Sequence, residues 1–154
     1  MALFEPAVEI TLENEGGYVW DKSDPGGETN FGISKRSYPN VDIKNLTKEE
    51  AIAIYRRDFW KFDGLIFQGI ATKLFDSYVN MGHLAILYAQ GIVLQGIKPD
   101  GIYGPETEDA LNRAEPSVFI TAYRARLVKH YEDIVANNPD EAKFLDGWKR
   151  RANQ

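Results

Sequence analysis

The sequence has 154 residues, about one domain's worth and enough to bury an ordinary hydrophobic core. Hydrophobic residues make up 44% and charged residues 27%, which are ordinary values for globular proteins, so no long disordered segment is expected. Cysteine is absent, which excludes disulfides, thiolate metal sites and cysteine nucleophiles. The net charge of −5 argues against sequence-independent nucleic-acid binding, because such binding depends on clustered Lys and Arg.

The first predicted element is an amphipathic helix that ends at Gly16 or Gly17, because glycine commonly ends helices. One face of this helix carries side chains at helical spacing, namely Phe4, Val8, Thr11, Leu12 and Glu15. After it, "SDPGG" (residues 23–27) is a cluster of turn residues, and "ETNFGIS" (28–34) is typical of a short strand. The sequence therefore predicts a small hairpin or irregular β lobe directly after the first helix.

The rest of the chain predicts helices. Thr47 and Glu50 have the spacing of a capping box, so the second helix begins at about residue 48. Further helices are expected over about 69–81, 84–95, from Pro105, 116–137, and from Pro139 or Asp140 to about 152. The basic run at 149–151 is interpreted as the solvated end of the last helix, where cations are favoured. The predicted fold is mainly α (α+β), a helical bundle with a small N-terminal β-hairpin lobe.

Only the turn-rich region 96–104 offers a boundary within the chain. We therefore expect two parts, residues 1–95 and residues 96–154, packed as one compact unit.

Glu15 is the residue for which the local sequence suggests chemistry. It lies on the core-facing side and at the C-terminal end of its helix, where desolvation and the helix dipole both disfavour a charged carboxylate. A protonated carboxyl beside a cleft is what general-acid cleavage of a glycosidic bond requires. Asp24, in a polar turn, is expected to stay ionised, which gives the division of labour of a glycosidase pair. The alternative is a purely structural role for Glu15.

Two polar residues and several glycines follow this pair. Thr29 or Asn30, on the predicted strand, could hold a water or a substrate group opposite Glu15. Glycines such as Gly27 would let a sugar chain approach the backbone closely, or would simply allow a positive φ.

The segment "ENEGGYVWDKSDPGGETNFGIS" resembles the N-terminal signature of glycoside hydrolase family 108, the phage and bacterial muramidases. The matching positions are Glu15, Gly16, Gly17, Tyr18, Asp24, Gly26, Gly27, Thr29, Gly32 and Ile33. Downstream, "FDSYVNMG" (75–82) is similar to the middle helix of that family, and "DGIYGPETEDAL" (100–111) resembles its peptidoglycan-binding-like helical part. The resemblance covers nearly the whole chain. It implies a lysozyme-like, mainly α fold and hydrolysis of the β-1,4 bond between N-acetylmuramic acid and N-acetylglucosamine.

The resemblance also implies roles for single residues. Glu15 becomes the general acid, while Asp24 and Thr29 fit the aspartate and hydroxyl residue that follow on the β lobe in lysozyme-like enzymes. Whether Asp24 is nucleophile, base or an orienting group stays open, as does a retaining or an inverting outcome, which depends on the distance between the carboxyls. The expected substrate-binding residues are Tyr18, Trp20, Gly27 and Asn30, with a packed aromatic as the alternative for Tyr18.

Peptidoglycan strands are the expected partner, and neither nucleic acid nor a cofactor is expected. No metal site is expected either, because His83 and His130 lack the spacing of paired ligands. The N-terminal 15 residues do not have the pattern of a signal peptide, and the longest apolar stretch is too short and too polar to span a bilayer. We therefore expect a monomer made in the host cytoplasm, released through a holin if phage-encoded, and acting on the cell wall. The alternative is a muramidase fold that binds peptidoglycan or a protein without catalysis.

Overall fold

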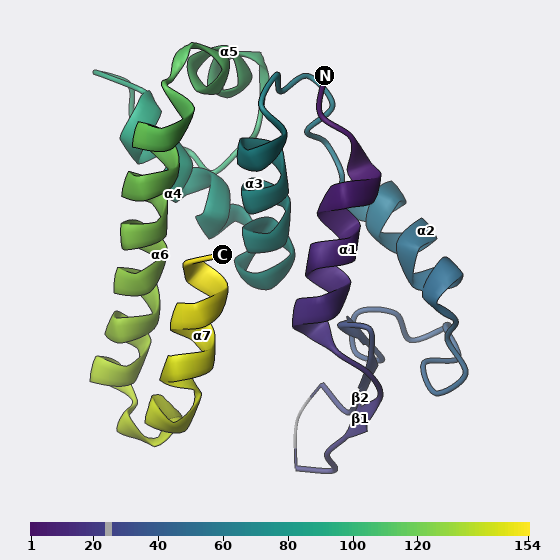
Figure 1. Ribbon diagram of the computed structural model, residues 1–154. Helices are drawn as coiled ribbons and strands as arrows, with labels where there is room; N and C mark the ends of the chain where they lie inside the picture. The colour runs from purple at the N-terminus through teal and green to yellow at the C-terminus, as the bar shows by residue number, and fades with distance from the viewer. Residues whose placement is uncertain (24–25) are drawn as a thin grey trace.

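Helices dominate the computed structural model, which describes residues 1–23 and 26–154 and confirms the predicted mainly α fold (Figure 1). The helices are α1 (Phe4–Glu15), α2 (Lys48–Asp58), α3 (Gln68–Met81), α4 (His83–Val93), α5 (Pro105–Arg113), α6 (Pro116–Asn137) and α7 (Leu145–Ala152), with a 3₁₀ helix η1 (Pro139–Phe144) before α7. The strands are β1 (Val19–Trp20), β2 (Glu28–Asn30) and β3 (Ile33–Ser34), which form one antiparallel sheet in the order β1-β2-β3.

Helix α1 forms and ends as its sequence pattern predicts. Phe4, Val8 and Leu12 are buried on one face, which packs on α3. Gly16 ends the helix with a φ of +74°, and its N–H donates to the carbonyl of Leu12 at 3.1 Å. This turn places Glu15 at the last helical position, where the chain leaves the helical bundle for the β lobe.

The β lobe differs from the prediction in one detail. The segment "ETNFGIS" is not one strand, because a two-residue turn at Phe31 and Gly32 divides it into β2 and β3. Both turn residues have a positive φ, +52° and +79°, as the tight turns of β-hairpins often require. The lobe is therefore a three-stranded meander rather than a single hairpin.

The predicted helix ends are confirmed where capping residues mark them. Thr47 and Glu50 form the capping box of α2, with the N–H of Glu50 at 3.2 Å from Thr47 Oγ1 and the N–H of Thr47 at 2.8 Å from Glu50 Oε2. The last predicted helix is wrong in its first turns, since residues 139–144 are 3₁₀ and the α-helix begins only at Leu145. Short 3₁₀ segments are common at helix N-termini.

The C-terminal helices return the chain to its beginning. Figure 1 shows α7 (yellow) lying between α6 and the lower end of α1, and α7 packs on α6. One buried hydrophobic cluster contains side chains from both halves of the chain, among them Leu12, Leu74, Leu127 and Ala152. The last turn of α7 therefore lies next to α1 and α3, whereas the division at residue 95 stays a prediction.

Candidate active site

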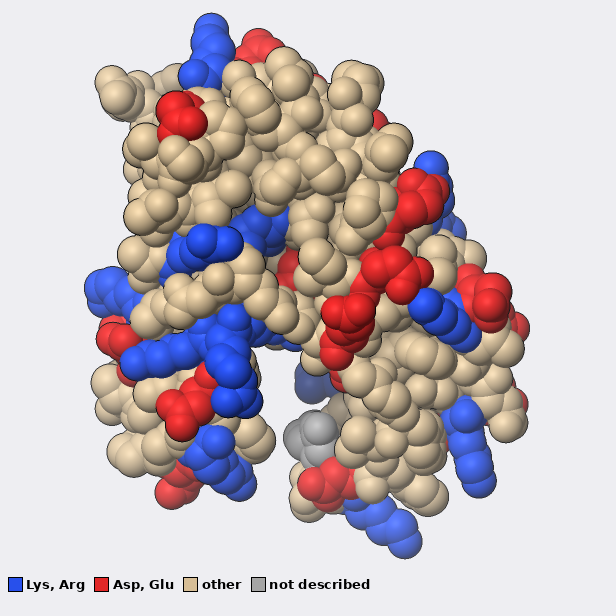
Figure 2. All heavy atoms as spheres, viewed as in Figure 1, with Lys and Arg blue, Asp and Glu red and all other residues tan. Residues whose placement is uncertain are grey.

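An open notch lies in the surface beside the C-terminal end of α1, the helix whose last residue is Glu15. Figure 2 shows the notch on the lower half of this face, between the α7 end of the molecule and the β lobe, and the C-terminal end of α1 lies beside it in Figure 1. The side chain of Glu15 is 20% exposed, so its carboxyl is mostly shielded from water yet reachable from outside. A carboxyl in this position can meet a polymer that lies in the notch.

An arginine from the far end of the chain holds this carboxyl. Arg151, in the last turn of α7, donates from Nη2 to Glu15 Oε1 at 2.8 Å. The same guanidinium group binds Asp76 of α3 in a bidentate manner, with Nε at 3.0 Å from Oδ2 and Nη2 at 3.0 Å from Oδ1. A planar guanidinium group suits this geometry, because its donors form a fixed fork.

Asp76 is the buried anchor of the arrangement. It is 4% exposed and also accepts from Thr11 Oγ1 at 2.9 Å and from Asn14 Nδ2 at 3.3 Å, both on α1. Burial alone would lower the pKa of Arg151, but the hydrogen bonds and charges of Asp76 and Glu15 outweigh it and raise the pKa above its ordinary value. Arg151 is therefore a permanent cation between two carboxylates.

This cation corrects the environment expected for Glu15. The local sequence indicated two effects that favour a protonated carboxyl, and it did not reveal Arg151. Arg151 places an opposite charge at hydrogen-bond distance from this carboxyl, which neither local effect takes into account. The basic run at 149–151 is likewise not wholly solvated, because the side chain of Arg151 is only 13% exposed.

The other side of Glu15 packs against the β2–β3 turn and α2. A Cβ atom at Gly32 would lie 2.7 Å from Cγ of Glu15 and 2.5 Å from the hydroxyl oxygen of Tyr55. That hydroxyl donates to the carbonyl of Phe31 at 2.7 Å, and burial, followed by the charge of Glu15, raises the pKa of Tyr55. Glu15 is thus confined between Arg151, Gly32 and Tyr55.

A cavity of about 550 Å³ begins at Gly32 and Tyr55 and extends toward the end of α2. Its polar lining includes Tyr38, whose hydroxyl donates to Asp58 Oδ2 at 2.7 Å. Burial and then Asp58 raise the pKa of Tyr38 to about 12, while hydrogen bonds from Arg57 and Tyr38 lower the pKa of Asp58 to about 2. The cavity next to Glu15 therefore presents a fixed anion and hydroxyl groups, which suit a hydroxyl-rich ligand.

Comparisons with known proteins identify two regions of the chain. Residues 8–82 match the family "Glycosyl hydrolase 108", and residues 83–153 match the "Predicted Peptidoglycan domain". The chain combines a glycosyl hydrolase family 108 domain with a predicted peptidoglycan domain. The structure of Brucella abortus SagA is similar to it, with 27% sequence identity, a TM-score of 0.77 and coverage of 97% of this chain and 88% of that chain. No curated protein matches the sequence.

The two family matches meet between Gly82 and His83, where α3 gives way to α4. Glu15 and Asp76 lie in the family 108 domain, whereas Arg151 lies in the peptidoglycan domain. The ion pairs of Arg151 therefore join the two domains at the candidate active site.

The residues predicted on the β lobe fall into two groups. Tyr18 and Trp20 are 39% and 61% exposed, and the Tyr18 hydroxyl donates to Glu28 Oε2 at 2.8 Å. Thr29 is half-buried in β2, whereas Asn30 is buried and donates from Nδ2 to the carbonyl of Ile43 at 3.0 Å. Tyr18, Trp20 and Thr29 are thus available to a ligand, while Asn30 holds the backbone of the following loop.

Two further predictions concern the turn before β2. Gly27 has a φ of +70°, and a Cβ atom there would meet nothing within 4 Å, so backbone conformation explains this glycine without a ligand. Asp24, the predicted second carboxylate, lies outside the described residues. Among residues 1–23 and 26–154, no three His, Asp or Glu side chains are grouped so that they could hold a metal ion.

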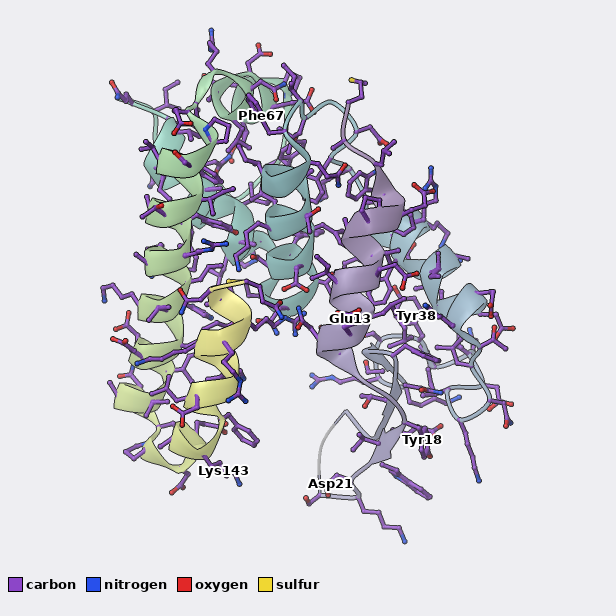
Figure 3. All side chains as sticks on the ribbon, viewed as in Figure 1. Glu13, Tyr18, Asp21, Tyr38, Phe67 and Lys143 are labelled. Carbon is purple, nitrogen blue, oxygen red and sulfur yellow. The ribbon has the colours of Figure 1, made fainter. Side chains whose placement is uncertain are left out.

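Charge is distributed unevenly around the notch. Lys and Arg gather on its α7 side in Figure 2, where the last turn carries Lys149, Arg150 and Arg151. In Figure 3, Lys143 lies at the foot of this side and Asp21 at the tip of the β lobe opposite. A protein with a net charge of −5 therefore still offers a basic wall to an anionic polymer.

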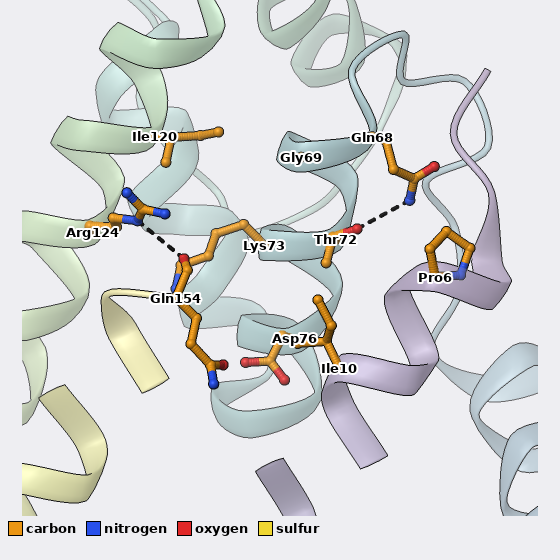
Figure 4. Close-up of a pocket in the computed structure, with 10 residues that line it drawn as sticks. All are labelled: Pro6, Ile10, Gln68, Gly69, Thr72, Lys73, Asp76, Ile120, Arg124 and Gln154. Carbon is orange, nitrogen blue, oxygen red and sulfur yellow. Dashed lines mark hydrogen bonds between the residues drawn. The ribbon is translucent and has the colours of Figure 1, made fainter. Parts of the chain in front are cut away.

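A second cavity, of about 370 Å³, lies between α1, α3 and α6, next to Asp76 (Figure 4). Lys73 lines it and is only 6% exposed, with Nζ donating to the carbonyl of Arg151 at 2.9 Å. Burial lowers the pKa of Lys73 to about 8, partly offset by the charge of Asp76. Lys73 therefore helps to hold the last turn of α7, although burying its ammonium group costs desolvation energy.

Lys73→Met is expected to flatten the pH dependence of stability. In the wild type the unfolded chain binds more protons than the folded chain between pH 8 and 10.5, because only the folded pKa of Lys73 is lowered. The free energy of unfolding should therefore rise by about 2 kcal/mol from about pH 7 to 9.5. Urea denaturation at several pH values measures this slope. Lys129→Met, at an exposed lysine of α6, should keep the slope, and an unchanged slope in Lys73→Met would contradict the expectation.

Proposed function

We propose that this protein is an N-acetylmuramidase that hydrolyses the β-1,4 bond between N-acetylmuramic acid and N-acetylglucosamine in bacterial peptidoglycan. The observation that carries the proposal is Glu15, a half-buried carboxyl at the C-terminal end of α1 that Arg151 holds on one side and Gly32 and Tyr55 confine on the other. The family 108 match and the peptidoglycan domain support a glycan substrate from the cell wall.

In the proposed reaction, Glu15 gives its proton to the glycosidic oxygen as the bond from that oxygen to C1 of N-acetylmuramic acid breaks. The positive charge that develops at C1 is stabilised by a carboxylate, and Asp24 is the candidate for this role. A water molecule then adds its oxygen to C1, and its proton leaves to a carboxylate or to solvent. Thr29 is a better candidate than Asn30 to position this water, because the Asn30 amide already binds backbone carbonyls.

The glycan strand is proposed to lie in the notch between the β lobe and α7. Tyr18 and Trp20 of the β lobe expose aromatic surface, and such surface stacks well on sugar rings. Lys149 and Arg150 lie on the basic side, which favours the carboxylates of peptidoglycan stems. Both domains would thus contribute to substrate binding.

The products released from purified cell walls test this function. Digestion is followed by borohydride reduction and mass spectrometry, which identify the sugar at each new reducing end. Reduced N-acetylmuramic acid supports the proposal. Reduced N-acetylglucosamine would indicate a glucosaminidase, products lighter by one water would indicate a transglycosylase, and wall binding without release would favour a non-catalytic peptidoglycan-binding module.

We further propose an endolysin role, with synthesis in the host cytoplasm and release to the wall through a holin. Among the described residues, no helix combines the length and the apolarity needed to cross a membrane. Expression in bacteria with and without an inducible holin tests this route. Lysis that depends on the holin supports it, and equal lysis without the holin contradicts it.

A further inference from the structure

We propose that Arg151 is a positioning residue for Glu15, so that the last turn of the peptidoglycan domain is part of the catalytic centre. The proposal rests on the muramidase function proposed above and deepens it. It assigns to the C-terminal helix a second task besides binding glycan, namely to fix the direction of the carboxyl that protonates the glycosidic oxygen.

The position of Arg151 is itself fixed from two directions. Its side chain is bound by both oxygens of the buried Asp76, so the plane of the guanidinium group cannot rotate without breaking two hydrogen bonds. Its backbone carbonyl accepts from the buried ammonium group of Lys73 at 2.9 Å. The contact from Nη2 to Glu15 is therefore made by a group that is already held, and it can orient Glu15 rather than follow it.

The remaining contacts of Glu15 do not replace this orientation. Gly32 and Tyr55 limit the space beside the carboxyl, whereas the hydroxyl of Tyr55 donates elsewhere, to the carbonyl of Phe31. The hydrogen bond from Arg151 is thus the charged contact that selects one side-chain conformation of Glu15. A reacting group displaced by about 1 Å can lose about 100-fold in rate, so this selection matters for catalysis.

The charges around Glu15 come from four helices. Arg151 of α7 is the cation in contact with it, Asp76 and Lys73 of α3 lie behind that cation, and Tyr55 of α2 and Tyr131 of α6 are buried hydroxyls. Without Arg151, Glu15 and Asp76 would face each other without a cation between them, and like charges hold protons more strongly. The loss of Arg151 should therefore change the pH dependence of the reaction as well as its rate.

The test compares three variants in two measurements. The variants are Arg151→Gln, which removes the cation, Arg151→Lys, which keeps the charge without the fork, and the double variant Arg151→Gln with Asp76→Asn, which leaves no unpaired buried anion. Lys129→Gln on α6 is the control, since it removes an equal charge from an exposed pair. The measurements are the pH profiles of kcat and KM on purified walls, and the titration of the Glu15 carboxyl carbon by NMR.

Arg151→Gln should lower kcat by about 10–100-fold with little change in KM, because Glu15 loses its orientation. Two midpoints should move to higher pH by about one to two pH units, namely that of the step in the pH profile of kcat that reflects protonation of Glu15 and that of the NMR titration of Glu15. The double variant also lacks the anion of Asp76, so its upward shift should be smaller but of the same sign, and it keeps the test valid if the single variant does not fold. Arg151→Lys should restore the midpoint of the pH profile, because it keeps the charge, but only part of kcat, because it lacks the fork of donors.

A folded Arg151→Gln or double variant whose Glu15 titration matches that of Lys129→Gln would overturn the proposal, and so would an unchanged kcat in Arg151→Gln. A wild-type protein that releases no fragments would instead remove the proposed muramidase function, and with it the catalytic part of this proposal. In that case the NMR titration still decides separately whether Arg151 controls the charge of Glu15.

Discussion

Glu15→Gln is expected to lower the rate of wall hydrolysis by about 10²–10⁴-fold, the usual contribution of a general acid or base. The amide cannot give a proton to the glycosidic oxygen, although it keeps the size of the side chain and an oxygen that can accept from Arg151. Binding to walls should persist, because the rest of the notch is unchanged. Clearing of a suspension of purified walls, together with sedimentation of the protein with the walls, measures both properties.

Glu13→Gln is the matched control for this substitution. Glu13 is exposed, lies on the same helix two residues before Glu15, and is labelled on α1 in Figure 3. The same chemical change at this position should leave the clearing rate near that of the wild type. An equal loss in both variants would indicate a general effect of charge on wall binding, and full activity of Glu15→Gln would remove Glu15 from the mechanism.

The helices could be predicted from the sequence because their ends are local. Glycine at the end of α1, the capping box of α2 and the prolines at the starts of α5 and α6 act within one or two turns of the chain. The division of residues 28–34 into two strands was harder to predict, since it depends on Phe31, a residue seldom found at positive φ. Local signals therefore fixed the helices better than the turns.

The candidate site could be predicted only in its N-terminal part. Glu15 stands out because a carboxyl at the end of an apolar helical face is unusual, and Tyr18, Trp20 and Thr29 follow within one short segment. Asp76 and Arg151 carry no such signal. Asp76 lies within "FDSYVNMG", whose resemblance to the family gives this residue no role, and Arg151 belongs to a basic run that fits a solvated helix end.

The charge of Glu15 shows why local reasoning was insufficient. Burial and the helix dipole depend on residues near Glu15 in the chain, whereas Arg151 lies 136 residues away. Packing of α7 on α6 brings this cation to hydrogen-bond distance from Glu15, and neither local effect takes that contact into account. The environment of an ionisable group depends on the tertiary structure, and the contacts that determine it cannot be predicted from a single sequence.

Gly32→Ala is expected to damage both stability and activity. Alanine at a φ of +79° costs about 1–3 kcal/mol in backbone strain. Its Cβ atom would also lie 2.7 Å from Cγ of Glu15 and 2.5 Å from the Tyr55 hydroxyl oxygen, and overpacking of this kind costs about 1–3 kcal/mol more. Because the new methyl group must push Glu15 or Tyr55 aside, kcat should fall by about 100-fold under conditions where the protein stays folded.

Gly82→Ala is the control that introduces the backbone strain of a positive φ without the steric clash. Gly82 has a φ of +63°, yet a Cβ atom there would meet no other atom within 4 Å. This control should lose about 1–3 kcal/mol of stability by the strain alone and keep its kcat, because it touches nothing near Glu15. Urea denaturation and initial clearing rates compare the two variants. If Gly32→Ala keeps full kcat while it is folded, the β2–β3 turn does not confine Glu15, and the carboxyl must be positioned from the side of Arg151 alone.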